Sequence, residues 1–65
     1  MCDYRLILET ADAQDIHDYA AGYGVPAWQA RNWTSDAIVN GRSTRSIDHD
    51  SHLLIKTDSA FRLYC

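Results

Sequence analysis

Apolar residues are spaced differently in successive parts of the chain, and each spacing predicts a different element. Between Asp3 and Glu9 every second position is apolar, which is typical of a β-strand with one face against a core. Arg5 and Glu9 indicate that the other face of this strand is partly wet. Tyr4, Leu6 and Leu8 form the apolar face of the predicted strand, and Ile7 is an apolar residue on the other face.

The segment from Thr10 to Gly24 has the spacing of a helix. Thr10 is the predicted N-cap, because its hydroxyl oxygen can accept a hydrogen bond from an unpaired N–H group of the first turn. Gly22 and Gly24 predict where the helix ends. Between Thr10 and Gly24, apolar residues recur at steps of three and four, so they form one stripe that can face a sheet. The stripe consists of Ala13, Ile16, Tyr19, Ala20 and Tyr23.

A second, short helix is predicted from Pro26 to Trp33, since proline suits the first turn of a helix. Trp28 and Trp33 give it a large apolar surface, which either anchors the core or forms an interface. The polar residues 34–36 that follow predict a break.

Short strands joined by turns are expected after this break. Asn40-Gly41 is the strongest hairpin signal in the chain, because both positions of a type I′ turn need positive φ. It follows the apolar run 37–39, and residues 42–47 form the predicted return strand. Two more strands are predicted over 52–56 and 60–65, after turns at 48–51 and 57–59. In the last strand, the alternation places Phe61 and Leu63 on one face.

These elements predict one small α+β domain over residues 1–65. Its order is β-α-(short α)-β-β-β, with a largely antiparallel sheet of about four strands and helices on one face. The apolar share of 46% is ordinary for a globular chain and argues against intrinsic disorder. A chain of 65 residues buries a small core, so a role in presenting a surface is expected rather than an enclosed catalytic cleft.

The negative charge lies in the first half of the chain. Residues 1–33 contain five acids and two bases, whereas residues 34–65 contain four of each. Four acids without a base fall between Glu9 and Asp18, either as a solvated helix face or as a patch for a basic partner. We take the patch and the aromatic residues near it as the candidate binding site: Glu9, Asp12, Asp15, Asp18, Tyr19, Tyr23 and Trp28.

Cys2 and Cys65 would face each other if the first and last strands were antiparallel neighbours. The sequence carries no recognisable signal peptide and no membrane-spanning apolar run, which predicts an intracellular protein with free thiols.

The cluster Asp48-His49-Asp50-Ser51-His52 has metal-ligand residues. However, consecutive residues of an extended turn diverge, so a polar loop without metal is expected.

No catalytic motif is found. The chain lacks a glycine-rich phosphate loop, a nucleophile elbow and a scaffold for paired catalytic carboxylates, so neither an enzyme nor a bound cofactor is predicted.

The middle of the chain resembles the core of a helix-turn-helix. The residues that carry the resemblance are Tyr19-Ala20, Gly24-Val25-Pro26 and Ala30, and they are typical of any tight helix pair. The resemblance implies a DNA-binding regulator, but the preceding helix is acidic and would be repelled by phosphates. The groove-facing candidates would be Trp28, Gln29, Arg31 and Asn32.

The acidic side of the predicted first helix favours mimicry of DNA rather than binding to DNA. Carboxylates on a rigid helix can take the place of phosphates in a basic channel. In overall character, as a very short, acidic, single-domain chain without catalytic motifs, the sequence resembles phage-encoded anti-CRISPR proteins. That resemblance implies a non-enzymatic, monomeric inhibitor in the cytoplasm of the host bacterial cell. Its partner would be a Cas effector subunit with a basic nucleic-acid-binding surface, without direct contact with nucleic acid or membrane.

Overall fold

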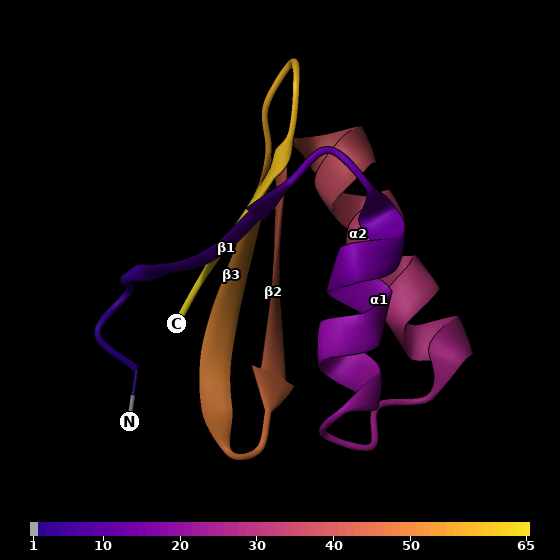
Figure 1. Ribbon diagram of the computed structural model, residues 1–65, viewed down its shortest axis with the longest axis vertical. Coiled ribbons are helices and arrows are strands. Elements are labelled where there is room, and N and C mark those ends of the chain that lie inside the picture. Colours follow the sequence, from indigo (N-terminus) through magenta and orange to yellow (C-terminus); the bar gives the residue numbers. More distant parts are fainter. Residues whose placement is uncertain (1) are drawn as a thin grey trace.

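The computed structural model describes residues 2–65, which form two helices and four strands. In chain order these are β1 (Leu6–Thr10), α1 (Ala13–Ala21), α2 (Ala27–Asn40), β2 (Arg42–Ile47), β3 (Asp50–Lys56) and β4 (Phe61–Tyr64). The strands form one antiparallel sheet in the order β1-β4-β3-β2. Both helices lie on the same side of the sheet, with α1 beside α2 (Figure 1). The predicted α+β class is therefore confirmed.

The core fills the layer between the sheet and the helices. Alternation along β4 buries Phe61 and Leu63, as the sequence predicted, and leaves Arg62 and Tyr64 half-buried on the opposite face. Leu54 of β3 and Ile47 of β2 continue the buried row across the sheet. The helices contribute Ile16, Ala20, Ala30, Trp33 and Ala37.

Helix α2 is longer than predicted, because it continues through the expected break at 34–36 and the apolar run at 37–39. Thr34 fits inside the helix because its hydroxyl donates to the carbonyls of Ala30 (3.3 Å) and Arg31 (3.1 Å). Ala37 is buried one turn beyond Trp33, so tertiary packing supports the extension. The prediction of a short second helix was wrong for this reason.

The predicted hairpin at Asn40-Gly41 was also wrong. Gly41 has a φ of 83°, but it uses this left-handed conformation to end α2. The two-residue hairpin turn lies instead at Asp48-His49, where φ is 53° and 68°, between the paired residues Ile47 and Asp50. Both positions have the positive φ of a type I′ turn, and Asp and His tolerate it better than most residues.

Strand β1 begins later than predicted. Tyr4 has a φ of 56°, which interrupts an extended strand, and a register shift separates Leu6 from Leu8 in the pairing with β4. As a result only Leu8 packs against the core, while Tyr4 and Leu6 are 56% and 42% exposed. The predicted alternation therefore fails in the first half of the strand.

The N-cap of α1 is Asp12 rather than Thr10. The Asp12 side chain accepts from the backbone N–H of Gln14 at 2.9 Å, and Asp12 has the extended backbone of an N-cap. Thr10 ends β1 and accepts from the backbone N–H of Asp12 at 3.1 Å. Helix α1 ends before Gly22, and Gly24 has the positive φ (81°) that the turn into α2 requires.

Candidate functional site

Three carboxylates lie on the outer side of α1, and we call Asp12, Asp15 and Asp18 the acidic face of α1. All three residues are exposed. The carboxylates accept hydrogen bonds from uncharged groups: the Gln14 backbone on Asp12 (2.9 Å), the Thr10 hydroxyl on Asp15 (2.5 Å) and the Gln14 side-chain amide on Asp18 (2.9 Å). These bonds fix the positions of the carboxylates without removing their charge.

None of these three carboxylates forms an ion pair with a basic side chain of residues 2–65. The ion pairs found there join Arg5 to Asp3 (3.8 Å) and Arg62 to Glu9 (3.5 Å), both on the sheet side of the molecule. Within residues 2–65, the negative charges of the acidic face are therefore not neutralised by an ion pair.

Glu9 is not brought together with the acidic face. It pairs across the sheet with Arg62, which lies between the buried Phe61 and Leu63 and therefore points to the face opposite the helices. Its carboxylate is partly neutralised there by the Arg62 guanidinium. Of the four acids in the predicted patch, the structure groups three.

Some of the aromatic side chains are exposed, and the others are packed against or hydrogen-bonded to neighbouring residues. Tyr23 and Trp28 are 52% and 60% exposed, at the end of α1 and the start of α2. Tyr19 is half-buried, and its ring centroid lies 5.2 Å from that of Tyr23. Trp33 is 1% exposed and its Nε1–H donates to the Ser43 carbonyl at 3.2 Å. One tryptophan therefore anchors the core and the other is left on the surface.

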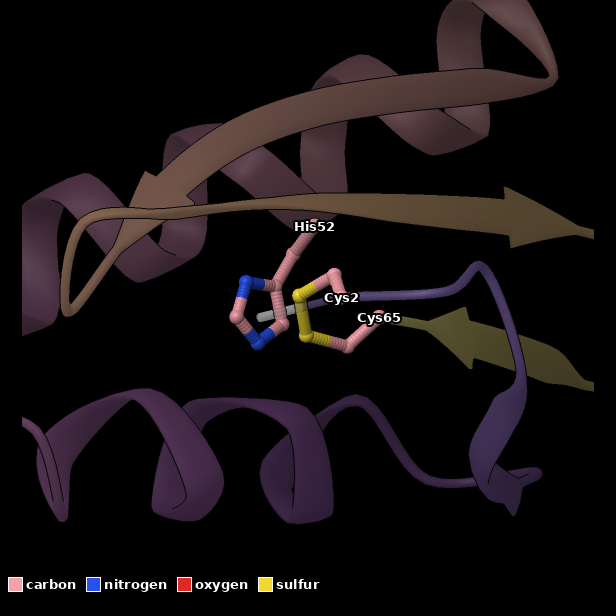
Figure 2. Close-up of side chains that lie close together, drawn as sticks. All are labelled: Cys2, His52 and Cys65. Atoms are coloured by element: carbon pink, nitrogen blue, oxygen red, sulfur yellow. A yellow bond between two sulfur atoms is a disulfide. The ribbon is translucent and has the colours of Figure 1, made fainter.

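Cys2 and Cys65 form a disulfide, so the prediction of free thiols was wrong. β1 and β4 are antiparallel neighbours, and their hydrogen bonding continues beyond the strands, with Arg5 and Cys65 exchanging two backbone bonds (2.9 and 3.0 Å). This brings the two cysteine Cα atoms to 4.5 Å, within the range that a disulfide requires. The ring of His52 lies beside the two sulfur atoms (Figure 2).

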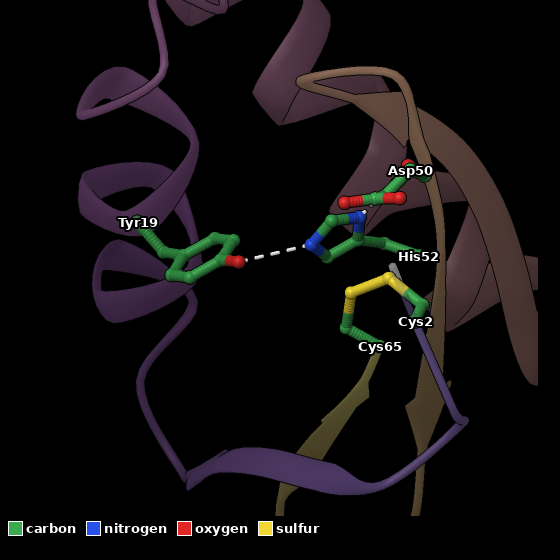
Figure 3. The surroundings of a disulfide bond; sticks show 5 residues. All are labelled: Cys2, Tyr19, Asp50, His52 and Cys65. Carbon is green, nitrogen blue, oxygen red and sulfur yellow. Dashed lines mark hydrogen bonds between the residues drawn. A yellow bond between two sulfur atoms is a disulfide. The ribbon is translucent and has the colours of Figure 1, made fainter.

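His52 connects the disulfide to helix α1. It is 3% exposed, and both of its ring nitrogens are hydrogen-bonded: Nδ1 to the Asp50 carbonyl at 3.0 Å and Nε2 to the Tyr19 hydroxyl at 2.9 Å (Figure 3). Because a carbonyl only accepts, Nδ1 carries the proton, and the Tyr19 hydroxyl donates to Nε2. Burial, contact with Tyr23 and the negative charges of Asp50 and Asp48 raise the pKa of Tyr19 to about 12.

The two histidines of the turn at 48–52 lie apart in the structure. His49 is exposed at the tip of the β2–β3 hairpin, whereas His52 points into the layer between sheet and helices. Among the described residues, the one group with metal-ligand spacing is Cys2, His52 and Cys65. The sequence does contain a signal that His52 is buried. His52 lies two positions before Leu54 on β3, so alternation places both side chains on the same, buried face.

An open cleft of about 680 Å³ lies elsewhere, against the end of α2 and the start of β2. Its polar lining includes Asp36, Asn40, Arg42 and Thr44, and none of the predicted site residues.

Neither helix within the described part of the chain is long and apolar enough to cross a membrane. Comparisons by sequence and by structure find no matching protein family, no similar curated protein and no similar solved structure.

Proposed function

We propose that this protein is a non-enzymatic inhibitor whose acidic face of α1 occupies a basic, nucleic-acid-binding surface of a protein complex and excludes DNA. The observation that supports the proposal is the exposure of Asp12, Asp15 and Asp18 without a basic partner in residues 2–65. Consecutive phosphates of one DNA strand are spaced by about 3.4 Å along the axis, and three residues of helix rise about 4.5 Å. The rise of about 9 Å from Asp12 to Asp18 corresponds to two to three phosphate steps, so the carboxylates can meet cations arranged for phosphates.

Apolar contacts must accompany the charges, because exposed ion pairs contribute only about 0.2–1 kcal/mol each. Tyr23 and Trp28 are the exposed aromatic side chains next to the carboxyl end of α1. Aromatic residues of this kind provide much of the affinity in protein interfaces. Tyr19 is the third aromatic candidate, and it acts through its contact with Tyr23 because its hydroxyl is engaged by His52.

The resemblance to anti-CRISPR proteins directs the search for a partner to Cas effector complexes. These complexes hold nucleic acid in positively charged channels. The proposed inhibitor acts in the cytoplasm of a bacterial cell, as a monomer, by occupying the DNA-entry surface of one effector subunit.

The test is binding of a purified effector complex by the natural protein and by the triple variant Asp12→Asn, Asp15→Asn, Asp18→Asn. Asparagine caps a helix as well as aspartate does, so the variant removes charge and keeps the cap. We expect the dissociation constant to rise roughly tenfold or more, from the loss of three ion pairs.

The matched control removes the same charge from three other exposed aspartates: Asp36→Asn, Asp48→Asn and Asp58→Asn. The control should keep the dissociation constant of the natural protein within about twofold, because a general charge effect is weak at physiological salt. Equal weakening by both triple variants, measured by calorimetry, would argue against recognition through α1.

The alternative function is a DNA-binding regulator that uses α2, where Trp28, Arg31 and Asn32 are exposed and Gln29 is engaged by Arg45. A mobility-shift titration with mixed-sequence duplex DNA separates the two functions. The inhibitor should leave the DNA unshifted at every salt concentration, whereas a regulator should give a shift that weakens steeply as salt is raised.

A further inference from the structure

Three ligand atoms that suit borderline and soft metal ions meet at the inner side of α1. The Sγ atoms of Cys2 and Cys65 and a ring nitrogen of His52 all lie within 4.8 Å of one another (Figure 2). The imidazole is almost fully buried and the two cysteines are half-buried. Thiolate and imidazole together, in tetrahedral arrangement, are a donor set typical of zinc.

The hydrogen bonds of His52 leave its ring in a form that can bind a metal. Nδ1–H donates to the Asp50 carbonyl at 3.0 Å, so the proton is held on that nitrogen, and the Nε2 lone pair can bind a metal once the metal displaces the Tyr19 hydroxyl from it. Metal-binding histidines commonly donate their second N–H to a backbone carbonyl in this way. While the disulfide is intact, the Nε2 lone pair accepts from the Tyr19 hydroxyl at 2.9 Å (Figure 3).

The spacing of the three donors is close to that of a tetrahedral zinc site. With Zn–S of about 2.3 Å and Zn–N of about 2.0–2.1 Å, neighbouring ligand atoms lie roughly 3.4–3.8 Å apart. The sulfur atoms must separate after reduction, and the imidazole nitrogen must approach by at most about 1.4 Å from the 4.8 Å limit. Cys2 and Cys65 lie outside β1 and β4, so their side chains can turn without breaking a strand.

We propose that, once the disulfide is reduced, the protein binds one Zn²⁺ ion through Cys2, Cys65 and His52, with water or another small ligand in the fourth position. A zinc ion held in this way joins residues 2 and 65, as the disulfide does. The site is independent of the proposed function, because it lies on the inner side of α1 and does not involve the acidic face.

The reduction is a two-electron thiol–disulfide exchange. A dithiol reductant attacks one sulfur, the S–S bond between Cys2 and Cys65 breaks, and the reductant leaves as its own disulfide. The two electrons and two protons that it gives up convert both cysteines to thiols. Zinc binding then displaces both thiol protons, because thiolates are the metal ligands. Reducing conditions therefore exchange a covalent link for a metal link at the same place.

The first measurement uses Co²⁺ as a spectroscopic probe of the full chain, reduced with a phosphine under anaerobic conditions. One equivalent of Co²⁺ should produce a thiolate-to-cobalt charge-transfer band and the intense visible bands of tetrahedral coordination. Zn²⁺ should bleach them, because it binds such sites more tightly than Co²⁺. Weak octahedral absorption, or bands that do not saturate at one equivalent, would overturn the proposal. The oxidised protein serves as the negative control.

The second measurement compares zinc affinities by competition with a chromophoric chelator. Replacing both cysteines (Cys2→Ser, Cys65→Ser) should abolish binding, and His52→Gln should weaken it at least tenfold. The matched control is His49→Gln, since His49 is exposed at the hairpin tip outside the cluster, and it should leave the affinity unchanged. An unaltered affinity in folded His52→Gln would reject the three-ligand site. If that variant does not fold, the cobalt spectrum of the natural chain decides.

Discussion

The two sides of helix α1 differ in how their polar groups are used. On the outer side, the acidic face is exposed, and its hydrogen bonds within residues 2–65 come from uncharged groups. On the inner side, Ile16 and Ala20 are fully buried, and Tyr19 donates to a histidine beside the disulfide. If the proposed function is right, this helix of nine residues separates recognition on one side from stability on the other. Changes on the inner side should alter stability, and most changes on the outer side should alter binding alone.

The largest expected effect on the inner side is loss of the disulfide. Cys2 and Cys65 are separated by 63 positions, and closing a loop of that length is worth about 4 kcal/mol of unfolding free energy in the chain-entropy model. We expect reduction without metal, or the double variant Cys2→Ser, Cys65→Ser, to lower the urea midpoint accordingly. Coincident unfolding curves for the oxidised and reduced protein would contradict this expectation.

The next largest effect is expected for Ile16→Ala, at about 3 kcal/mol, because the truncation leaves a cavity against the core. Asp18→Ala, two residues away on the outer side, should change the unfolding free energy by less than about 0.5 kcal/mol. Urea titration at low temperature measures both. Similar losses in the two variants would show that the sides of α1 are not separate.

Asp12 should be the exception to the comparison, since it belongs to the acidic face and also caps α1. Asp12→Ala should cost about 1 kcal/mol of stability, whereas Asp12→Asn should keep the cap and cost little. Thermal unfolding of the two variants distinguishes these effects. If alanine and asparagine are equivalent, the cap does not contribute to stability.

A further effect, confined to alkaline pH, concerns Tyr19. Its pKa is raised to about 12, compared with about 10 in an unfolded chain. Its contribution to stability is complete below pH 10 and is lost as the pH rises through about 12, because the unfolded chain releases the proton first. We expect the stability of Tyr19→Phe to fall less steeply over that range. Tyrosinate absorbance of the natural protein should include a titration step near pH 12, and this step should be missing in Tyr19→Phe.

The parts of the fold that were predicted correctly are those decided by local pattern. Along β4 the alternation of Phe61 and Leu63 with polar positions is enough to identify the buried face. The length of α2 could not be predicted from local pattern. Thr34, Ser35 and Asp36 favour a break, and the helix continues because Thr34 bonds to its own helix and Ala37 is buried beyond it. Gly41 then has positive φ in either structure, as a helix cap or as a hairpin turn.

The candidate sites show the same limit. The spacing of Asp12, Asp15 and Asp18 on one helix follows from the sequence, but the pairing of Glu9 with Arg62 depends on the order of the strands. The cluster of Cys2, His52 and Cys65 depends on that order as well. It forms because β4 lies between β1 and β3, and short-range spacing carries no record of such long-range pairing.

The most direct test of the central claim is whether the protein and DNA can occupy an effector complex together. The protein is titrated against the effector bound to labelled target DNA, and both components are followed by two-colour fluorescence. We predict stoichiometric release of the DNA, with release requiring the acidic face of α1 and becoming weaker as salt is raised. A ternary complex in which the DNA stays bound at saturating concentrations of the protein would contradict the account.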